Sequence, residues 1–363
     1  MNLTVEEKYF VWLSSFPFLT PAKIRDFKEK FGSYEKVFIC AGNADPFFAE
    51  KLESDEVGKL SFAATDEFVK NLLLNFEKQK VGILTKSNKE YYLLFKEKAS
   101  LCDIDILYYK GDLSLLKTKS VAIVGTRRPD AYGKRVTEQF ASEIASNGVT
   151  IISGLAAGVD GIAHEKALEV GGKTIAVLGG GFNHIYPPFH AALAERIARE
   201  GLLLSEYAPQ TLPSSFHFPV RNRIIAGLSD AVLITQAGEK SGSMHTKNYA
   251  IDYGKDLFVI PADITREESK GTNGILANMP HALVISPSDL LEKIGVKPSE
   301  KKEKAVQISM EEQLVLDAVG SEEVHFSEIL SKTKMDSKNL SSLLTRMKVS
   351  GIIKQLPGNY FSK

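Results

Sequence analysis

Short apolar runs alternate with amphipathic segments through residues 81–296, and this alternation constrains the fold more than any other feature of the sequence. Several runs are almost continuously apolar, which is typical of strands covered on both faces of a parallel sheet. Segments with apolar residues at every third or fourth position separate most of them. The pattern predicts an α/β fold with an extended, Rossmann-like, doubly wound sheet. The strands are expected at 121–125, 149–153, 174–179, 202–206, 231–236, 257–261 and 282–286.

The two ends of the chain have different patterns. Residues 1–80 carry apolar residues at helical spacing, which predicts a helical N-terminal domain. Residues 297–307 are rich in lysine and glutamate, which predicts a solvated linker. Residues 308–363 show three short helical patterns followed by two β-like runs, as in a winged helix. We therefore expect three domains, with the sheet domain over 81–296.

The charge balance limits how the chain can bind a polyanion. The 45 lysines and arginines equal the 45 aspartates and glutamates, so any such binding must come from local clusters of charge. No apolar run approaches the ~18 residues that cross a bilayer. The two cysteines, Cys40 and Cys102, lack the spacing of a metal site. We expect a cytoplasmic protein with no membrane insertion, no metal and no cofactor.

The first predicted strand ends at Gly125, which is the first residue of the sequence GTRRPDAYG. Ligands of doubly wound sheets bind beyond the carboxyl ends of the strands, where this loop lies. Backbone N–H groups after Gly125, together with the start of the next helix, can cradle a phosphate, and Arg127 can add a bidentate contact. The alternative is an ordinary strand–helix turn with surface arginines. The spacing is not GxGxxG, which argues against a dinucleotide site.

The second predicted strand is followed by the sequence SGLAAGVDGIAH. Gly154 and Gly158 would let a ligand backbone approach closely. Asp160 is placed to cap a helix beginning at Gly161, and His164 lies four residues further along the same face. Such a pair could do acid–base chemistry, but capping and packing are the simpler interpretation.

The segment FHFPVRNR places aromatic and basic residues at the start of an amphipathic helix. Phe218 comes just before Arg221, Asn222 and Arg223. Arginine beside an exposed aromatic ring suits single-stranded nucleic acid, because phosphates need charge and bases need a stacking surface. The alternative is an arginine-rich helix start packed on its own sheet. Arginine there opposes the helix dipole, so it needs an anionic partner.

The segment GEKSGSMHT offers small hydroxyls and free amides at another helix start, where a plain N-cap is the alternative. All these loops would meet at one sheet edge, which indicates anion binding without a recognisable catalytic set. We predict no catalytic or metal-binding residue. The predicted nucleic-acid-binding residues are Gly125, Thr126, Arg127, Arg128, Gly154, Gly158, Phe218, Arg221, Asn222, Arg223, Ser241, Gly242 and Ser243.

Taken in order, these motifs resemble the DNA-processing protein A family, DprA or Smf. The resemblance rests on VAIVGTRRPDAYG, SGLAAGVDGIAHEKAL, TIAVLGGGFNHIYPP, FPVRNRIIAGLSDAVLIT and SGSMHT. It implies a domain that binds single-stranded DNA without known catalysis, protects DNA in natural transformation and loads the RecA recombinase. It also implies an N-terminal domain of the SAM or helix-hairpin-helix kind and a homodimer formed through the Rossmann domain. Arg127 matches the family's DNA-contacting arginine, and Arg221 and Arg223 lie in its basic helix start.

The sequence departs from the family's usual residues at several loop positions. Ala157 stands where a basic residue is usual, Gln236 replaces an acid, and Ala262 replaces the glycine of a proline–glycine pair. These changes leave the details of the pocket open.

Two other functions remain open from the residues alone. A Rossmann-fold nucleotide-processing enzyme, similar to nucleoside monophosphate phosphoribohydrolases, could use the glycine loops, Arg127 and the pair Asp160 and His164. The sequence lacks the PGGxGT loop of that enzyme type. The other is a winged-helix transcription regulator with a ligand-sensing Rossmann domain. The winged helix itself could contact DNA, or it could have a protein-binding or stabilising role.

Overall fold

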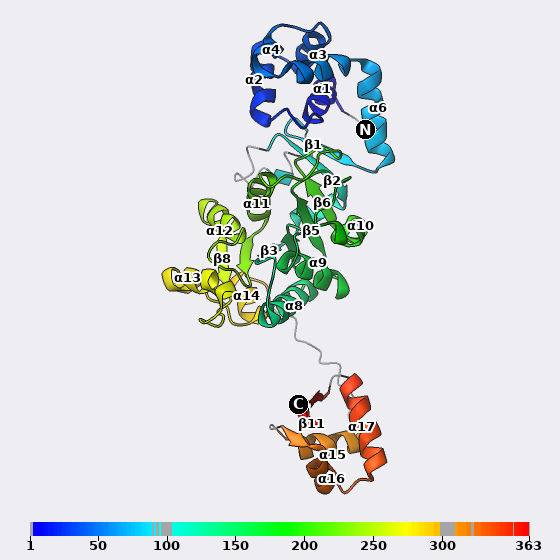
Figure 1. Ribbon diagram of the computed structural model, residues 1–363, viewed down its shortest axis with the longest axis vertical. Coiled ribbons are helices and arrows are strands. Elements are labelled where there is room, and N and C mark those ends of the chain that lie inside the picture. Colours follow the sequence, from blue (N-terminus) through cyan, green and yellow to red (C-terminus); the bar gives the residue numbers. More distant parts are fainter. Residues whose placement is uncertain are drawn as a thin grey trace. The chain divides into compact units, whose positions relative to one another are not determined.

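The computed structural model describes residues 3–88, 91, 94–95, 104–297, 309–320, 323–350 and 352–362. Its contacts divide the chain into two units, Met1–Pro298 and Ser299–Lys363 (Figure 1). Almost all of the predicted linker and Cys102 lie outside the described residues. The domain boundaries proposed from the sequence stay predictions. Within the described ranges, no helix is both long and apolar enough to span a membrane.

An eight-stranded sheet forms the centre of the first unit, in the order β1-β2-β6-β5-β4-β3-β7-β8. Strands β3 to β8 pair in parallel, whereas β1 and β2 pair antiparallel at one edge. This confirms the predicted α/β class with a mostly parallel sheet. The strands are β1 (Gly82–Thr85), β2 (Ile106–Gly111), β3 (Ser120–Val124), β4 (Thr150–Ser153), β5 (Thr174–Leu178), β6 (Leu202–Ser205), β7 (Ala231–Ile234) and β8 (Asp256–Val259).

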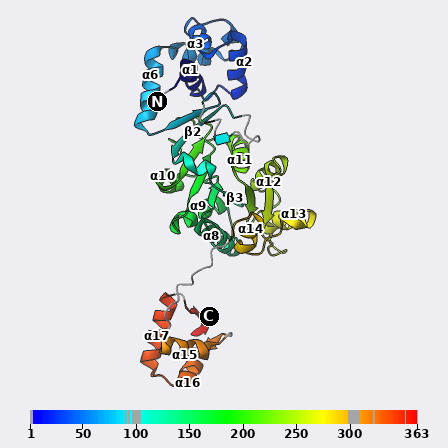
Figure 2. The ribbon, with the colours of Figure 1, turned by 180° about the vertical axis from the view of Figure 1, so that it is seen from behind.

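Helices cover both faces of this sheet (Figures 1 and 2). Alternate residues of β3 point to opposite sides: Val121 and Ile123 belong to one apolar core, and Ala122 and Val124 to the other. Helices α8, α9 and α14 supply the first core, and α11, α12 and α13 the second. The helices are α8 (Ala131–Ser146), α9 (Val159–Glu169), α10 (Ala191–Glu200), α11 (His217–Leu228), α12 (Ser243–Asp252), α13 (Lys270–Asn278) and α14 (Pro287–Lys293).

The strand predicted at 282–286 was wrong. Only a single bridge joins Val259 to Leu283, within a connection from the short 3₁₀ helix η5 (Pro280–Ala282) to α14. Ser286 caps α14 and Pro287 occupies its first turn, so the chain leaves the sheet edge before a ladder can form. Conversely, β1 and β2 extend the sheet beyond the strands expected from the sequence.

Six helices precede the sheet and share an apolar core with it. Trp12 is fully buried and its indole Nε1 donates to the carbonyl of Ala63 at 2.9 Å. The same core includes Tyr108 of β2, whose hydroxyl lies 2.6 Å from Ser14 Oγ. The predicted helical character of this region is confirmed. The helices are α1 (Val5–Ser14), α2 (Pro21–Phe31), α3 (Tyr34–Gly42), α4 (Phe47–Lys51), α5 (Ser54–Phe62) and α6 (Asp66–Lys78).

The described residues of the second unit form three helices and a small antiparallel sheet of order β10-β11-β9, as expected for a winged helix. Asp336 caps α17 by accepting from two backbone N–H groups, and Leu340 and Met347 of that helix are buried. Arg346 and Lys348 of the same helix are exposed. The elements are α15 (Met310–Val319), β9 (Val324–His325), α16 (Phe326–Thr333), α17 (Ser337–Val349), β10 (Lys354–Leu356) and β11 (Tyr360–Ser362).

Candidate nucleic-acid interface

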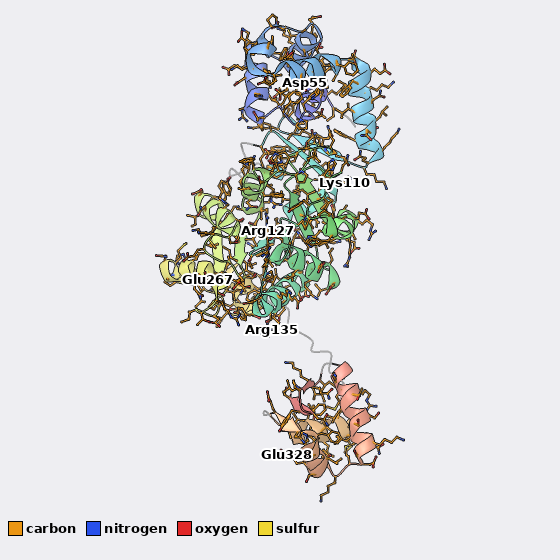
Figure 3. The ribbon with its side chains drawn as sticks, viewed as in Figure 1. Asp55, Lys110, Arg127, Arg135, Glu267 and Glu328 are labelled. Atoms are coloured by element: carbon orange, nitrogen blue, oxygen red, sulfur yellow. The ribbon has the colours of Figure 1, made fainter. Side chains whose placement is uncertain are left out.

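A cavity of about 1040 Å³ opens at the carboxyl edge of the sheet, and we call it the central pocket. Its walls are the loop after β3, the start of α11, the loop before α12 and the 3₁₀ helix η4 (Glu267–Ser269). Arg127 and Glu267 both line it, although they come from distant parts of the sequence (Figure 3). The predicted residues among its lining are Gly125, Thr126, Arg127, Arg128, Phe218, Arg221, Asn222, Ser241, Gly242 and Ser243.

The loop after β3 is held by its backbone and leaves its two arginines free. Thr126 N donates to the carbonyl of Gln236 at 2.8 Å. A Cβ at Gly125 would come within 2.7 Å of the same carbonyl, so this close approach needs glycine. The side chains of Arg127 and Arg128 are exposed, and neither has an ion-pair partner within the described part of the chain.

Aromatic rings stand beside these arginines. The Arg127 guanidinium carbon lies 5.5 Å from the centroid of the Phe218 ring, within the range of a cation–π contact. The ring of Tyr186 lies 5.5 Å from that of Phe218 and is about half exposed. This side of the pocket therefore offers both a cation and an apolar stacking surface.

Arg221 lines the pocket too, but the protein already satisfies it. Its side chain is buried, and its Nη1 donates to the carbonyls of Gly154, at 2.6 Å, and Val177. Burial lowers the pKa of Arg221 to about 10, and nearby Asp160 opposes that shift. The guanidinium remains charged at neutral pH and ties the ends of β4 and β5 to α11. This matches the alternative of an arginine-rich helix start packed on its own sheet.

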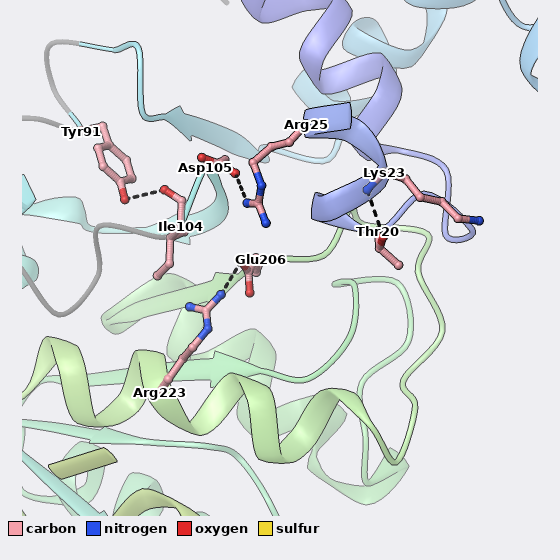
Figure 4. Close-up of polar contacts among 8 residues, drawn as sticks. All are labelled: Thr20, Lys23, Arg25, Tyr91, Ile104, Asp105, Glu206 and Arg223. Atoms are coloured by element: carbon pink, nitrogen blue, oxygen red, sulfur yellow. Dashed lines mark hydrogen bonds and ion pairs between the residues drawn. The ribbon is translucent and has the colours of Figure 1, made fainter. Parts of the chain in front are cut away.

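Arg223 does not line the pocket. Its Nη2 donates to Glu206 Oε1 at 2.6 Å, and each of the two side chains is only 11% exposed (Figure 4). The anionic partner that the helix dipole demands is therefore Glu206, from the end of β6. The structure brings Arg223 together with this carboxylate and not with the other predicted site residues.

Gly154 and Gly158 also lie outside the pocket lining. A Cβ at Gly154 would meet Arg221 Nη2 at 2.6 Å, and one at Gly158 would meet the carbonyl of Thr126 at 2.5 Å. Gly158 also has a φ of +80°. Both glycines let two loops pack closely, so their need for glycine is explained inside the protein.

The predicted pairing of Asp160 with His164 has a different outcome. Helix α9 starts at Val159, so Asp160 lies in its first turn and is not its cap; its carboxylate accepts from Gly154 N at 3.1 Å. His164 is fully buried, and its Nδ1 lies 2.6 Å from Thr174 Oγ1. Burial lowers the pKa of His164 to about 3, so its imidazole is neutral. The capping expectation was wrong, and the two side chains have separate partners.

The loop before α12 completes the pocket. Ser241 Oγ lies 2.8 Å from Ser243 Oγ, and Asn222 Nδ2 donates to the carbonyl of Gly242 at 3.3 Å. Thr246 Oγ1 is buried and has no hydrogen-bond partner among the described residues. Backbone N–H groups at this helix start favour an anion.

Sequence reasoning missed several residues of the pocket. Thr246 is one of the hydroxyls that the segment GEKSGSMHT offers, although the predicted binding residues do not include it. Glu239 and Lys240 lie in the same segment, whereas Glu267 and Glu268 come from a segment without a motif of its own. The charged and hydroxyl residues of the lining that the predicted set leaves out are Glu239, Lys240, Thr246, Glu267, Glu268 and Ser215.

The profile of one protein family, described as DNA recombination-mediator protein A, matches residues 82–295. This range holds the whole sheet and every residue that lines the central pocket. The chain belongs to this family.

Relatives in the family are similar over the same region. The DNA processing protein DprA of Bacillus subtilis is 42% identical over 195 residues, which is 53% of this chain and 65% of that protein. Protein Smf of Escherichia coli is 41% identical over 189 residues, 52% of this chain and 50% of that protein. The match thus spans between half and two thirds of these relatives' length.

Two solved structures of the family share the fold. DprA from Streptococcus pneumoniae has a TM-score of 0.64 at 33% identity, over 81% of this chain and 99% of that chain. DprA from Helicobacter pylori, solved for its single-stranded DNA binding mode, has a TM-score of 0.53 at 38% identity, over 59% of this chain and 95% of that chain.

Proposed function

We propose that this chain binds single-stranded DNA in the central pocket, with little dependence on base sequence. The observation that carries the proposal is the pair Arg127 and Arg128, which line the pocket without an ion-pair partner among the described residues. A phosphate gains a full charge-assisted contact there, because no carboxylate of the protein must first be displaced. The single-stranded DNA binding mode of the Helicobacter pylori relative supports the proposal.

The aromatic side of the pocket favours single strands over duplex. The ring of Phe218 beside Arg127 can stack on an unpaired base, and every base has such a face. In a duplex the faces are already stacked. Discrimination between bases would need hydrogen bonds to their edges, for which the motifs of this pocket give no code.

We propose that binding is not followed by catalysis. The enzyme alternative would use Asp160 and His164 as an acid–base pair. Asp160 accepts backbone N–H groups beside Arg221, and His164 is neutral and bonded to Thr174. Neither group is poised for proton transfer with the other.

At the level of the cell, we propose a cytoplasmic role in recombination and DNA uptake. The chain would protect incoming single strands, load the RecA recombinase onto them, and act as a homodimer through its Rossmann domain. Membership of the family supports these proposals. Light scattering of the purified chain tests the dimer, and RecA filament assembly on covered DNA tests the loading.

The binding proposal is tested by the fluorescence anisotropy of labelled single-stranded and duplex oligonucleotides over a range of salt concentrations. We expect tighter binding to the single strand than to the duplex. We also expect a linear fall of log K with log salt, because arginines that contact phosphates release counterions from the DNA. Preferential binding of duplex would contradict the proposal. Incubation with nucleoside monophosphates checks the alternative, because steady release of free base would establish an enzyme.

A further inference from the structure

A second cavity, of about 650 Å³, opens beside the central pocket, and we call it the α8 cavity. The first turn of α8, the loop after β8 and the end of η4 form its walls. Its lining residues are Asp130, Ala131, Tyr132, Arg135, Pro261, Ala262, Asp263, Arg266 and Ser269.

Two segments of the chain contribute neighbouring residues to both cavities. In the loop after β3, Arg128 lines the central pocket and Asp130 lines the α8 cavity. In the segment around η4, Glu267 and Glu268 line the central pocket, while Ser269 lines the α8 cavity. Figure 3 labels Arg127 and Glu267, which line the central pocket, and Arg135, which lines the α8 cavity. Only Pro129 separates the two linings in the loop after β3, and in the segment around η4 Glu268 and Ser269 are consecutive.

Arg135 gives the α8 cavity an available cation. Its side chain is exposed on the first turns of α8, and no described residue forms an ion pair or hydrogen bond with it. Asp130, a carboxylate of the same lining, is already used as the cap of α8, because it accepts from Gly133 N at 2.8 Å. That hydrogen bond is the main reason why the pKa of Asp130 is lowered.

Arg266 supplies a second cation that is only loosely held. Its Nε lies 3.7 Å from Asp263 Oδ2, and both side chains are more than half exposed. Exposed pairs of this kind contribute little to stability. Asp263 also accepts from Thr265 N at 2.8 Å and from Thr265 Oγ1 at 2.7 Å, so it keeps partners if Arg266 turns away. Arg266 can therefore move to a phosphate at little cost.

Ser269 provides an independent indication that a ligand belongs there. Its side chain is 1% exposed, and its Oγ has no hydrogen-bond partner within the described residues. A buried hydroxyl without a partner is unfavourable, because it has lost its water without gaining a replacement. A phosphate or base oxygen in the cavity would accept its hydrogen.

We propose that the α8 cavity binds a further phosphate of the same single strand that occupies the central pocket. The DNA path then crosses the segment around η4, with Arg135 and Arg266 on the phosphate and the Ser269 hydroxyl donating to it. This inference rests on the proposed single-stranded DNA binding. It predicts that the binding footprint exceeds what the central pocket alone can hold.

The test compares oligonucleotides of increasing length, starting from a trinucleotide, with the double variant Arg135→Ala/Arg266→Ala. We expect the trinucleotide to bind the double variant as tightly as it binds the wild type. A long single strand should bind the double variant about tenfold more weakly than the wild type, with the salt slope reduced by about 1.4 for two lost contacts. The matched control is Lys134→Ala/Arg199→Ala, which removes two exposed cations outside both cavities and should keep the wild-type affinities.

Ser269→Ala gives a second readout that loss of folding cannot imitate. It should keep or raise the melting temperature, because it removes an unpartnered buried hydroxyl, while weakening only the long strand by about fivefold. Equal losses for short and long strands, or no loss for the double variant, would overturn the inference. Inorganic phosphate that competes with the trinucleotide alone would overturn it too, whereas failure of the wild type to bind any single strand would overturn the proposed function itself.

Discussion

Two pairs of arginines at one sheet edge have opposite environments. Arg127 and Arg128 extend from the loop after β3 into the central pocket and have no ion-pair partner in the described part of the chain. On α11, Arg221 donates to backbone carbonyls and Arg223 is paired with Glu206. A guanidinium that the fold has satisfied must give up its partners to bind DNA, whereas an unsatisfied one gains a partner. We therefore propose that the first pair binds DNA and that the second pair supports the fold around the pocket.

The largest expected effect that distinguishes the two pairs is the loss of stability on removing Arg221. Arg221→Ala leaves the carbonyls of Gly154 and Val177 unpaired and Asp160 without its buried cation. We expect a loss of about 3–5 kcal/mol in the free energy of unfolding, measured by urea denaturation. A variant of wild-type stability that fails only in DNA binding would show that Arg221 serves the ligand.

The burial of the His164 imidazole predicts that stability depends on pH. The pKa of His164 is about 3 in the fold, chiefly through burial, and about 6.5 in the unfolded chain. The unfolded chain then binds the extra proton between these values, so the stability falls as the pH decreases below 6.5. From pH 7 to pH 5 we expect wild type to lose about 2 kcal/mol more than His164→Gln. If the free energy of unfolding changed equally with pH in the two proteins, the imidazole would not be buried in its neutral form.

A double-mutant cycle on Arg223 and Glu206 tests whether this ion pair stabilises the fold. We expect a coupling energy of about 1–2 kcal/mol in unfolding, because both side chains are largely buried and charged. Single-stranded DNA affinity of the folded variants should stay at the wild-type value. A coupling of zero, together with weaker DNA binding, would place Arg223 with Arg127 and not with Arg221.

The smallest expected effect is that of Arg128→Ala. This arginine lines the pocket without an aromatic ring contact among the described residues, so it offers charge but no stacking surface. We expect the salt slope of single-stranded DNA binding to fall by about 0.7 and the melting temperature to stay unchanged. A fall in the melting temperature would indicate that Arg128 supports the fold instead.

The sequence predicted most of the sheet and the loops that build the pocket, because strand periodicity and the edge rule for parallel sheets depend on local pattern. The sequence could not show which of the four arginines have partners inside the protein. Arg221 donates to the backbone carbonyls of Gly154, just after β4, and of Val177 in β5, and the carboxylate that pairs with Arg223 lies 17 residues away at the end of β6. Such pairing depends on tertiary packing, as do the antiparallel strands at the sheet edge and the connection that replaced the strand expected at 282–286.

The measurement that tests the central claim most directly compares Arg127→Ala with Arg223→Ala, which remove the same charge from the same sheet edge. Affinity for a labelled single strand is measured against salt concentration for both variants and the wild type. We predict that Arg127→Ala binds about 10–100-fold more weakly with a salt slope smaller by about 0.7, while folded Arg223→Ala keeps the wild-type affinity and slope. Wild-type binding by Arg127→Ala, or equal losses in both variants, would contradict the account.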